Sequence, residues 1–126
     1  MDSGFLAISA GAVLGANLRF ALTLALERLF PAFPLGTLAV NVVGSLIAGI
    51  AIGWIEAGAA PAGAIRLFLV VGFCGAFTTF SAFSLETFSL ARAGLVTAAT
   101  GYVVASIALC LAATGLGFLL GGAARP

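Results

Sequence analysis

The feature that most constrains this chain is a series of four long apolar segments separated by short polar stretches. A helix of about 20 apolar residues crosses the hydrocarbon core of a bilayer. Hydrophobic residues make up 63% of the 126 residues and charged residues only 7%, and a soluble domain of this size could not bury so much apolar surface. The sequence predicts an all-α membrane protein, one four-helix transmembrane domain over residues 1–126, with spans at about 4–26, 35–55, 65–90 and 95–120.

The remaining composition argues against several classes of protein. The net charge is only +1, so the chain lacks the strongly basic surface of a nucleic-acid-binding protein. There is no His, and Cys74 and Cys110 both fall inside apolar segments, which argues against a His- or Cys-rich metal cluster and against a disulfide framework. We expect no catalytic residues and no enzymatic activity, and we expect membrane lipid to surround the spans.

The third apolar segment is irregular in its middle, where residues 72–86 read G-F-C-G-A-F-T-T-F-S-A-F-S-L-E. Gly72 and Gly75 loosen the helix, and the hydroxyls of Thr78, Thr79 and Ser81 offer the backbone non-helical hydrogen bonds. We predict a break between Gly75 and Thr78, near the bilayer midplane. Irregular backbone is tolerated there only where it is buried in protein or lines a watery path, and transporters place ion sites at such breaks. The alternative is an ordinary glycine-containing helix packed on a neighbour, with its Phe side chains facing lipid.

Polar side chains also occur inside the other spans. Arg19 lies in the first span, where it either snorkels to the interface or faces water or a partner. Asn41 lies in the second span, where it either joins helices or offers its amide to an anion. In the fourth span a weakly polar stripe recurs every four residues, along one helix face, at Tyr102, Ser106, Cys110 and Thr114. Because a thiol is a weak donor, the part played by Cys110 in this stripe stays open.

The groups near the middle of the spans favour an anion over a cation. The centre holds no acidic residue that would attract a cation or carry a proton. It offers an amide N–H, hydroxyls and the ring edges of Phe77, Phe80 and Phe83, and such edges carry partial positive charge. These groups suit a small anion that accepts hydrogen bonds strongly.

The arginines give the chain no preferred orientation in a membrane. With four spans, both termini lie on the same side, so Arg66 and Arg125 fall on that side and Arg28 and Arg92 on the other. An excess of positive residues on one side normally sets the orientation. Since the count here is two against two, the chain can insert both ways, and two copies in opposite orientation could pair about an axis in the membrane plane.

Two separate motifs resemble the bacterial fluoride channel family, called Fluc or CrcB. Residues 72–86 resemble the family's signature, and residues 36–45, G-T-L-A-V-N-V-V-G-S, resemble its second motif. The likeness covers the whole chain in length, span count and motif order. It implies a fluoride-selective channel that exports fluoride passively across the cell's inner membrane and lowers its cytoplasmic concentration. It also implies an antiparallel, dual-topology homodimer with two pores.

The resemblance further implies roles for individual residues. The fluoride pathway would be lined by Asn41, Phe80, Phe83, Ser106 and Thr114. To these we add the hydroxyls of Thr79 and Ser81 in the irregular stretch and of Tyr102 in the polar stripe. Arg19 would lie in the vestibule, because an arginine of the first helix is usual in the family. The backbone carbonyls of Gly75 and Thr78, from both copies, would hold a structural sodium ion. Ala76 and Ala82 stand where the family often has Gly and Thr, and neither departure touches a ligand position.

Two other functions fit a four-span pattern. A small multidrug exporter is also a dual-topology protein, but it needs a membrane-embedded carboxylate in its first helix, and residues 4–26 contain none. A non-conducting membrane assembly protein would need only small-residue stripes for helix contact, such as the glycines of the second span. Release of fluoride from liposomes that contain the purified protein separates these alternatives from a channel.

Overall fold

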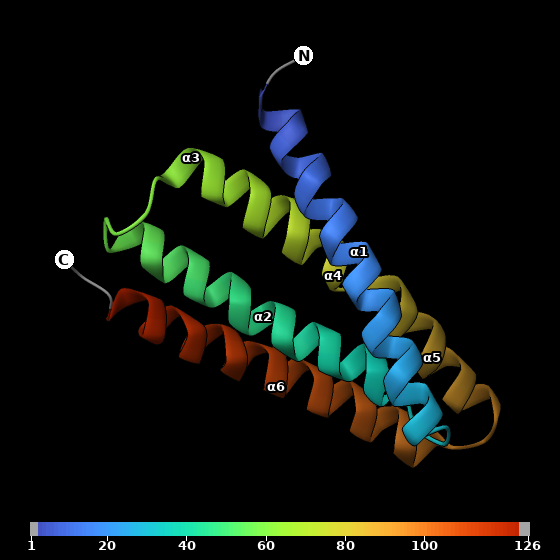
Figure 1. Ribbon diagram of the computed structural model, residues 1–126. Coiled ribbons are helices and arrows are strands. Elements are labelled where there is room, and N and C mark those ends of the chain that lie inside the picture. The colour runs from blue at the N-terminus through green and yellow to red at the C-terminus, as the bar shows by residue number, and fades with distance from the viewer. Residues whose placement is uncertain (1–2, 124–126) are drawn as a thin grey trace.

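Residues 3 to 123, which the computed structural model describes, form helices and contain no strand (Figure 1). Three helices are uninterrupted: α1 (Ser3–Leu29), α2 (Leu35–Glu56) and α6 (Val96–Gly122). The helical stretch Ala62–Arg92 is interrupted, and all four are long and apolar enough to cross a membrane. Within these residues the predicted all-α architecture with four membrane-spanning helices is confirmed.

The interrupted span consists of several pieces. α3 (Ala62–Ile65) leads into η1 (Arg66–Cys74), a π-helix, in which each amide bonds to the carbonyl five residues back. α4 (Gly75–Phe77) is a single turn, and α5 (Phe80–Arg92) begins after two extended residues. The π-helical geometry was not predicted, because a span that is apolar on every side carries no periodicity that distinguishes a π-helix from an α-helix.

Tight turns at glycine set the course of the chain between the spans. Gly58 (φ +74°) follows α2, and Gly94 (φ +80°) follows α5, in left-handed conformations that glycine adopts at no steric cost. At the end of α5, the amide of Gly94 donates to the carbonyl of Ala91 at 3.0 Å, and the amide of Leu95 donates to that of Leu90 at 3.0 Å. This turn returns the chain at once, so that α6 packs against α5.

α2 and α6 lie side by side and run in the same direction, in contact through glycine (Figure 1). A Cβ atom added at Gly49 would overlap the carbonyl of Thr114, and one added at Gly117 would overlap a backbone carbonyl of α2. The same arrangement repeats one turn further along, at Gly53 and Gly121. The two backbones therefore touch directly, and this is the most extensive contact between any two helices of the described chain.

α1 packs on η1 through glycines in the same way. A Cβ atom added at Gly11 would overlap the carbonyl of Phe68, and one added at Gly15 would overlap that of Phe73. The short helix α4, which follows η1, contacts both α1 and α2. Two closely packed helix pairs, α1 with η1 and α2 with α6, thus form a frame around the interrupted part of the third span.

The single chain buries few large side chains. Val40 and Tyr102 are fully buried and Thr37 is 2% exposed, whereas Phe80, next to the interruption, is 79% exposed. Lipid can cover apolar side chains on the outer faces of the helices. The exposure of Phe80 matters more, because it leaves the interrupted region open on one side.

A Gly117→Ala substitution should destabilise the protein, because the added methyl group meets a backbone carbonyl of α2 that cannot move without displacing the helix. Overpacking of this kind costs about 1–3 kcal/mol. Gly115→Ala, two residues away on α6, is the matched control, since a Cβ atom there would meet nothing within 4 Å. It should be neutral or stabilising by up to about 1 kcal/mol, because Ala favours helix over Gly. Thermal unfolding in detergent measures both, and equal midpoints for the two variants would contradict the close-contact model.

Candidate functional site

The centre of the candidate site is a two-residue interruption in the third span. Thr78 (φ −84°, ψ 159°) and Thr79 (φ −151°, ψ 115°) are both extended. Gly75 keeps helical angles (φ −60°, ψ −34°). The break therefore lies at Thr78–Thr79, later than the predicted stretch from Gly75 to Thr78. The two stretches share Thr78, and the hydroxyl and amide bonds of these residues, rather than flexibility at Gly75, accompany the break.

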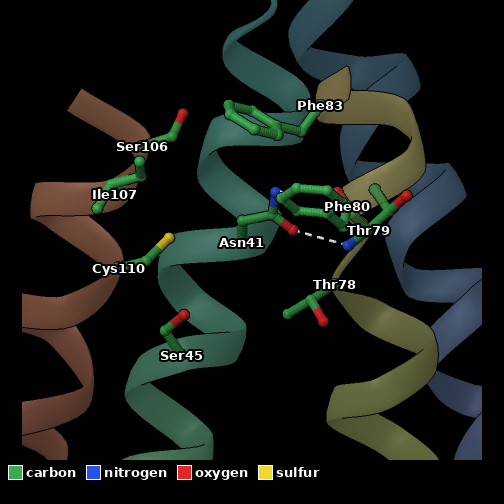
Figure 2. Close-up of a pocket in the computed structure, with 9 residues that line it drawn as sticks. All are labelled: Asn41, Ser45, Thr78, Thr79, Phe80, Phe83, Ser106, Ile107 and Cys110. Atoms are coloured by element: carbon green, nitrogen blue, oxygen red, sulfur yellow. Dashed lines mark hydrogen bonds between the residues drawn. The ribbon is translucent and has the colours of Figure 1, made fainter. Parts of the chain in front are cut away.

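Asn41 of α2 holds the interruption open by pairing with the backbone of Thr79. Its Oδ1 accepts a hydrogen bond from the Thr79 amide at 2.7 Å, and its Nδ2 donates to the Thr79 carbonyl at 3.1 Å (Figure 2). In a continuous α-helix the Thr79 amide would instead bond to the carbonyl of Gly75, four residues back. Asn41 thus replaces a helix carbonyl as the acceptor, and the Gly75 carbonyl loses its helical donor.

The side chain of Thr79 starts the next helix. Its Oγ1 accepts from the amide of Ala82 at 3.1 Å and so caps the N-terminus of α5. In a continuous helix that amide would bond to the carbonyl of Thr78. The Thr78 carbonyl instead accepts a long contact from Nη1 of Arg19, at 3.5 Å. The carbonyls of Gly75 and Thr78, the two predicted cation ligands, are thus both released from helical bonding.

A pocket of about 260 Å³ lies between the interruption, α2 and α6. Figure 2 shows the side chains that surround it, which come from these three elements. We call it the Asn41 pocket, and its lining is Asn41, Ser45, Thr78, Thr79, Phe80, Phe83, Ser106, Ile107 and Cys110. All nine side chains are uncharged. One N–H of the Asn41 amide bonds to Thr79, which leaves the second N–H of that group as a donor.

Aromatic rings and a buried hydroxyl complete the Asn41 pocket. The ring centroids of Phe80 and Phe83 lie 5.4 Å apart at an interplanar angle of 45°, so the two rings are tilted rather than stacked face to face. Ser106 is only 6% exposed, and its Oγ has no hydrogen-bond partner among the described residues. A buried hydroxyl without a hydrogen-bond partner destabilises the folded protein. The Ser106 hydroxyl is therefore a donor that is available to a bound acceptor.

A second pocket, of about 460 Å³, lies beside the interruption and shares Thr79 with the Asn41 pocket. We call it the Arg19 pocket, after the one basic residue in its lining. Ser81, Glu27 and Glu86 also line it. Thr79 therefore separates a space lined by charged residues from a space whose lining is neutral.

Glu86 of α5 is anchored by two hydroxyl groups from other helices. Thr37 of α2 donates to its Oε1 at 2.6 Å, and Tyr102 of α6 donates to its Oε2 at 2.7 Å. Both donors are almost fully buried. The carboxylate thus ties three helices together at the edge of the site. The sequence predicted no role for Thr37 or Glu86, because the donors to this carboxylate come from other spans, although a carboxylate within an apolar span needs such partners.

The structure brings most of the predicted pathway residues together. Five line the Asn41 pocket, namely Asn41, Thr79, Phe80, Phe83 and Ser106. Ser81 and Arg19 line the Arg19 pocket, and the ring of Tyr102 lies 5.3 Å from that of Phe83. Thr114 lies one helical turn beyond Cys110, to whose carbonyl it donates at 3.0 Å, and within residues 3 to 123 it is outside the lining of both pockets.

Four further residues line the Asn41 pocket: Ser45, Thr78, Ile107 and Cys110. Thr78 was predicted as a cation ligand and the part of Cys110 was left open, whereas Ser45 and Ile107 were given no part in the pathway. Ser45 could have been found, because it lies four residues after Asn41 and so shares its helix face. Ile107 could not, since an apolar residue in an apolar span carries no signal.

Comparison with known proteins gives a consistent family. The model of the family described as "CrcB-like protein, Camphor Resistance (CrcB)" matches residues 6–118. A protein of Chromohalobacter salexigens named "Fluoride-specific ion channel FluC" is 47% identical over 119 residues, which cover 94% of this chain and 90% of that protein. A protein of Paracoccus denitrificans with the same name is 42% identical over 123 residues, which cover 96% of each chain. On these matches, the chain belongs to the CrcB family.

Proposed function

We propose that this protein is a fluoride-specific channel that lets the anion move passively out of the cell through the inner membrane. The observation that carries the proposal is the Asn41 pocket, a neutral space lined by hydrogen-bond donors and phenyl rings at the interruption of a membrane span. Relatives at 42–47% identity are named fluoride-specific ion channels. Family membership also sets aside the multidrug exporter and the non-conducting assembly protein as readings of the four-span pattern.

The chemistry of the Asn41 pocket suits fluoride because this anion must exchange the hydrogen bonds of water for others of similar strength. The second N–H of Asn41 and the unpaired hydroxyl of Ser106 can donate to it. The edges of Phe80 and Phe83 add partial positive charge. A lining without a full positive charge lets the anion leave again, since conduction needs binding that is weak enough for release.

The Arg19 pocket provides a route to the Asn41 pocket. Arg19 supplies a positive charge that attracts anions, and it lies next to the interruption, where its Nη1 contacts the Thr78 carbonyl. Glu27 and Glu86 in the same lining carry negative charge, so the attraction is confined to the part of the pocket beside Arg19. Because Thr79 lines both pockets, an anion passing between them would cross beside this residue.

The working unit would be an antiparallel homodimer. In the single chain Phe80 is 79% exposed and Gly75 is exposed as well, so the site is open on the side where a second copy would pack. The balanced arginine count supports opposite orientations of the two copies. The second copy would supply the missing wall of the Asn41 pocket and would exclude lipid from it.

A sodium ion would join the two copies through backbone carbonyls. The carbonyls of Gly75 and Thr78 have lost their helical donors, and that of Thr78 has only a long contact of 3.5 Å from Arg19 in exchange. A carbonyl within a membrane that lacks its helical donor needs another partner. Carbonyl oxygens are hard, neutral ligands that suit a monovalent cation better than Mg²⁺, which holds its waters. When bound, the ion would supply positive charge that satisfies these oxygens and holds the chains together.

Asn41→Asp should reduce fluoride flux from proteoliposomes at least about a hundredfold. The carboxylate removes the donor and adds a like charge, and two charges about 4 Å apart repel by about 4 kcal/mol at an effective dielectric constant of 20. Asn17→Asp is the matched control, because Asn17 is an exposed residue of α1 that bonds only within its own helix. A fluoride electrode measures the flux. Equal flux from Asn41→Asp and the parent, at equal protein recovery, would remove Asn41 from the pathway.

Phe80→Ile and Phe83→Ile should each lower the flux at least about tenfold while the protein remains folded. Isoleucine keeps apolar bulk but lacks the electropositive ring edge, and a loss of about 1.4 kcal/mol of stabilisation corresponds to a tenfold effect. Phe88→Ile is the control on the same helix, since Phe88 is 59% exposed and lies outside the lining of both pockets within the described chain. The ring-edge account is wrong if both pocket variants conduct as the control does.

Exchange of Na⁺ for N-methylglucamine throughout purification should dissociate the dimer and abolish flux, and Na⁺ added back should restore both. Size-exclusion chromatography with light scattering reports the dimer. Thr78→Ser should keep the dimer, because the ion would use the backbone oxygen and serine retains the hydroxyl that donates to the Cys74 carbonyl at 2.8 Å. Gly75→Val should lose the dimer but not the fold, since a Cβ atom at Gly75 lies 3.9 Å from its nearest neighbour in the same chain.

The outcomes of this exchange separate the parts of the proposal. A monomer in Na⁺ that still conducts would contradict the proposal that the working unit is a dimer. A dimer that is stable without Na⁺ would contradict the proposal that a sodium ion joins the two copies.

Two arginines appended to the C-terminus should fix one orientation, so that this variant expressed alone loses flux. Full flux from it would contradict the antiparallel arrangement.

A further inference from the structure

Cys110 is a thiol inside the Asn41 pocket. It is half-buried on α6, and Figure 2 shows its sulfur directed toward the space in front of Asn41. Cys74, the other thiol, is 5% exposed within η1 and lies outside the lining of the Asn41 and Arg19 pockets in the described residues. The two cysteines therefore differ in access, and of the two Cys110 is the one that lines the Asn41 pocket.

Ser106 provides an independent sign that something binds beside Cys110. Its hydroxyl lines the same pocket, is 94% buried (6% exposed) and has no hydrogen-bond partner among the described residues. Residues four apart share one face of a helix, so this unused donor and the thiol are neighbours on α6. The Ser106 hydroxyl makes no hydrogen bond to the Cys110 sulfur in the described residues. A thiolate accepts hydrogen bonds better than a thiol does, so a metal-bound Cys110 would place a stronger acceptor one helical turn from this donor.

We propose that Cys110 is a binding site for soft, thiophilic metal species of low coordination number, such as an organomercury cation. With methylmercury hydroxide, the S–H bond of Cys110 breaks, an S–Hg bond forms, and the proton leaves with the displaced hydroxide as water, without any change in oxidation state. Soft cations select sulfur ligands, and a two-coordinate species needs only one from the protein. Zinc would need about four ligands, and the described residues contain no group of three or more His, Cys, Asp or Glu that could supply them.

The pocket has room for such a ligand. Its volume of about 260 Å³ is several times the roughly 30 Å³ that one water occupies in the liquid. A metal group on Cys110 would stand in front of Asn41 and Phe80. On the proposed function, it would occupy the fluoride pathway and close it, so the same site would make the channel sensitive to thiophilic metals.

The test treats the protein in lipid vesicles with methylmercury hydroxide and follows two readouts, the adducts on each cysteine by mass spectrometry and the fluoride flux. Flux is compared with that of the same variant before treatment. The parent and Cys74→Ser should gain an adduct on Cys110 and lose most of their flux, whereas Cys110→Ser should keep its own untreated flux. Ser106→Ala should form the adduct roughly three- to tenfold more slowly, the size of one hydrogen bond.

The two readouts keep this site distinct from the proposed function. Methylmercury on Cys74 alone, or on neither thiol, would overturn the Cys110 site whatever the flux. Rapid labelling of Ser106→Ala at the rate of the parent would overturn the role of Ser106 in it. An adduct on Cys110 that leaves the fluoride flux of a conducting protein unchanged would contradict the proposal that a metal group at Cys110 closes the pathway. A parent without fluoride flux would refute the proposed function, while the adduct would still decide the site.

Discussion

The pairing of one side-chain amide with one backbone unit governs the architecture of this protein. Asn41 accepts from the amide of Thr79 and donates to its carbonyl, and it thereby satisfies in an apolar environment the two groups that a broken helix would leave costly and exposed. Without this pairing, the third span would have reason to continue as a helix. This pairing accounts for the interruption, for the released carbonyls of Gly75 and Thr78, and for the cap at Thr79. Asn41 thus shapes the site as well as lining it, so the amide has both a structural task and, on the proposed function, a task toward the anion.

The frame around the interruption is rigid for two different reasons. The glycines of α1, α2 and α6 bring backbones into direct contact, which allows little rearrangement without separation of the helices. Glu86 adds a polar anchor, because its two oxygens bond to hydroxyl groups of α2 and α6. Both devices act close to the Asn41 pocket and hold its walls in place. Preorganised donors of this kind can replace the water around an anion without first paying to become ordered, which is what a selective pathway for a strongly hydrated ion requires.

The sequence allowed the coarse fold and much of the site to be predicted, since long apolar segments and two motifs are local signals. It placed Asn41, Phe80 and Ser106 in one pathway, and they line one pocket. The features that could not be predicted are contacts between residues far apart in the sequence. Asn41 meets Thr79 across 38 residues, and Thr37 meets Glu86 across 49, and no spacing rule connects such positions. The same limit explains why the predicted break, from Gly75 to Thr78, included Gly75, which is helical, and left out Thr79, which Asn41 holds extended. Thr114 shares the helical period of Ser106 but lies outside the described linings of both pockets, because periodicity identifies a face and not how far along it a pocket extends.

The glycine contact between α2 and α6 also limits how the length of this chain can change. Gly49 and Gly53 each fit against one particular carbonyl of α6, and Gly117 and Gly121 fit against carbonyls of α2. One inserted residue would turn the following part of a helix by about 100°. All glycines beyond the insertion would then leave the interface together, and larger side chains would take their places against the carbonyls. Insertions and deletions should therefore be confined to the connections between spans, while the spans themselves vary only by substitution.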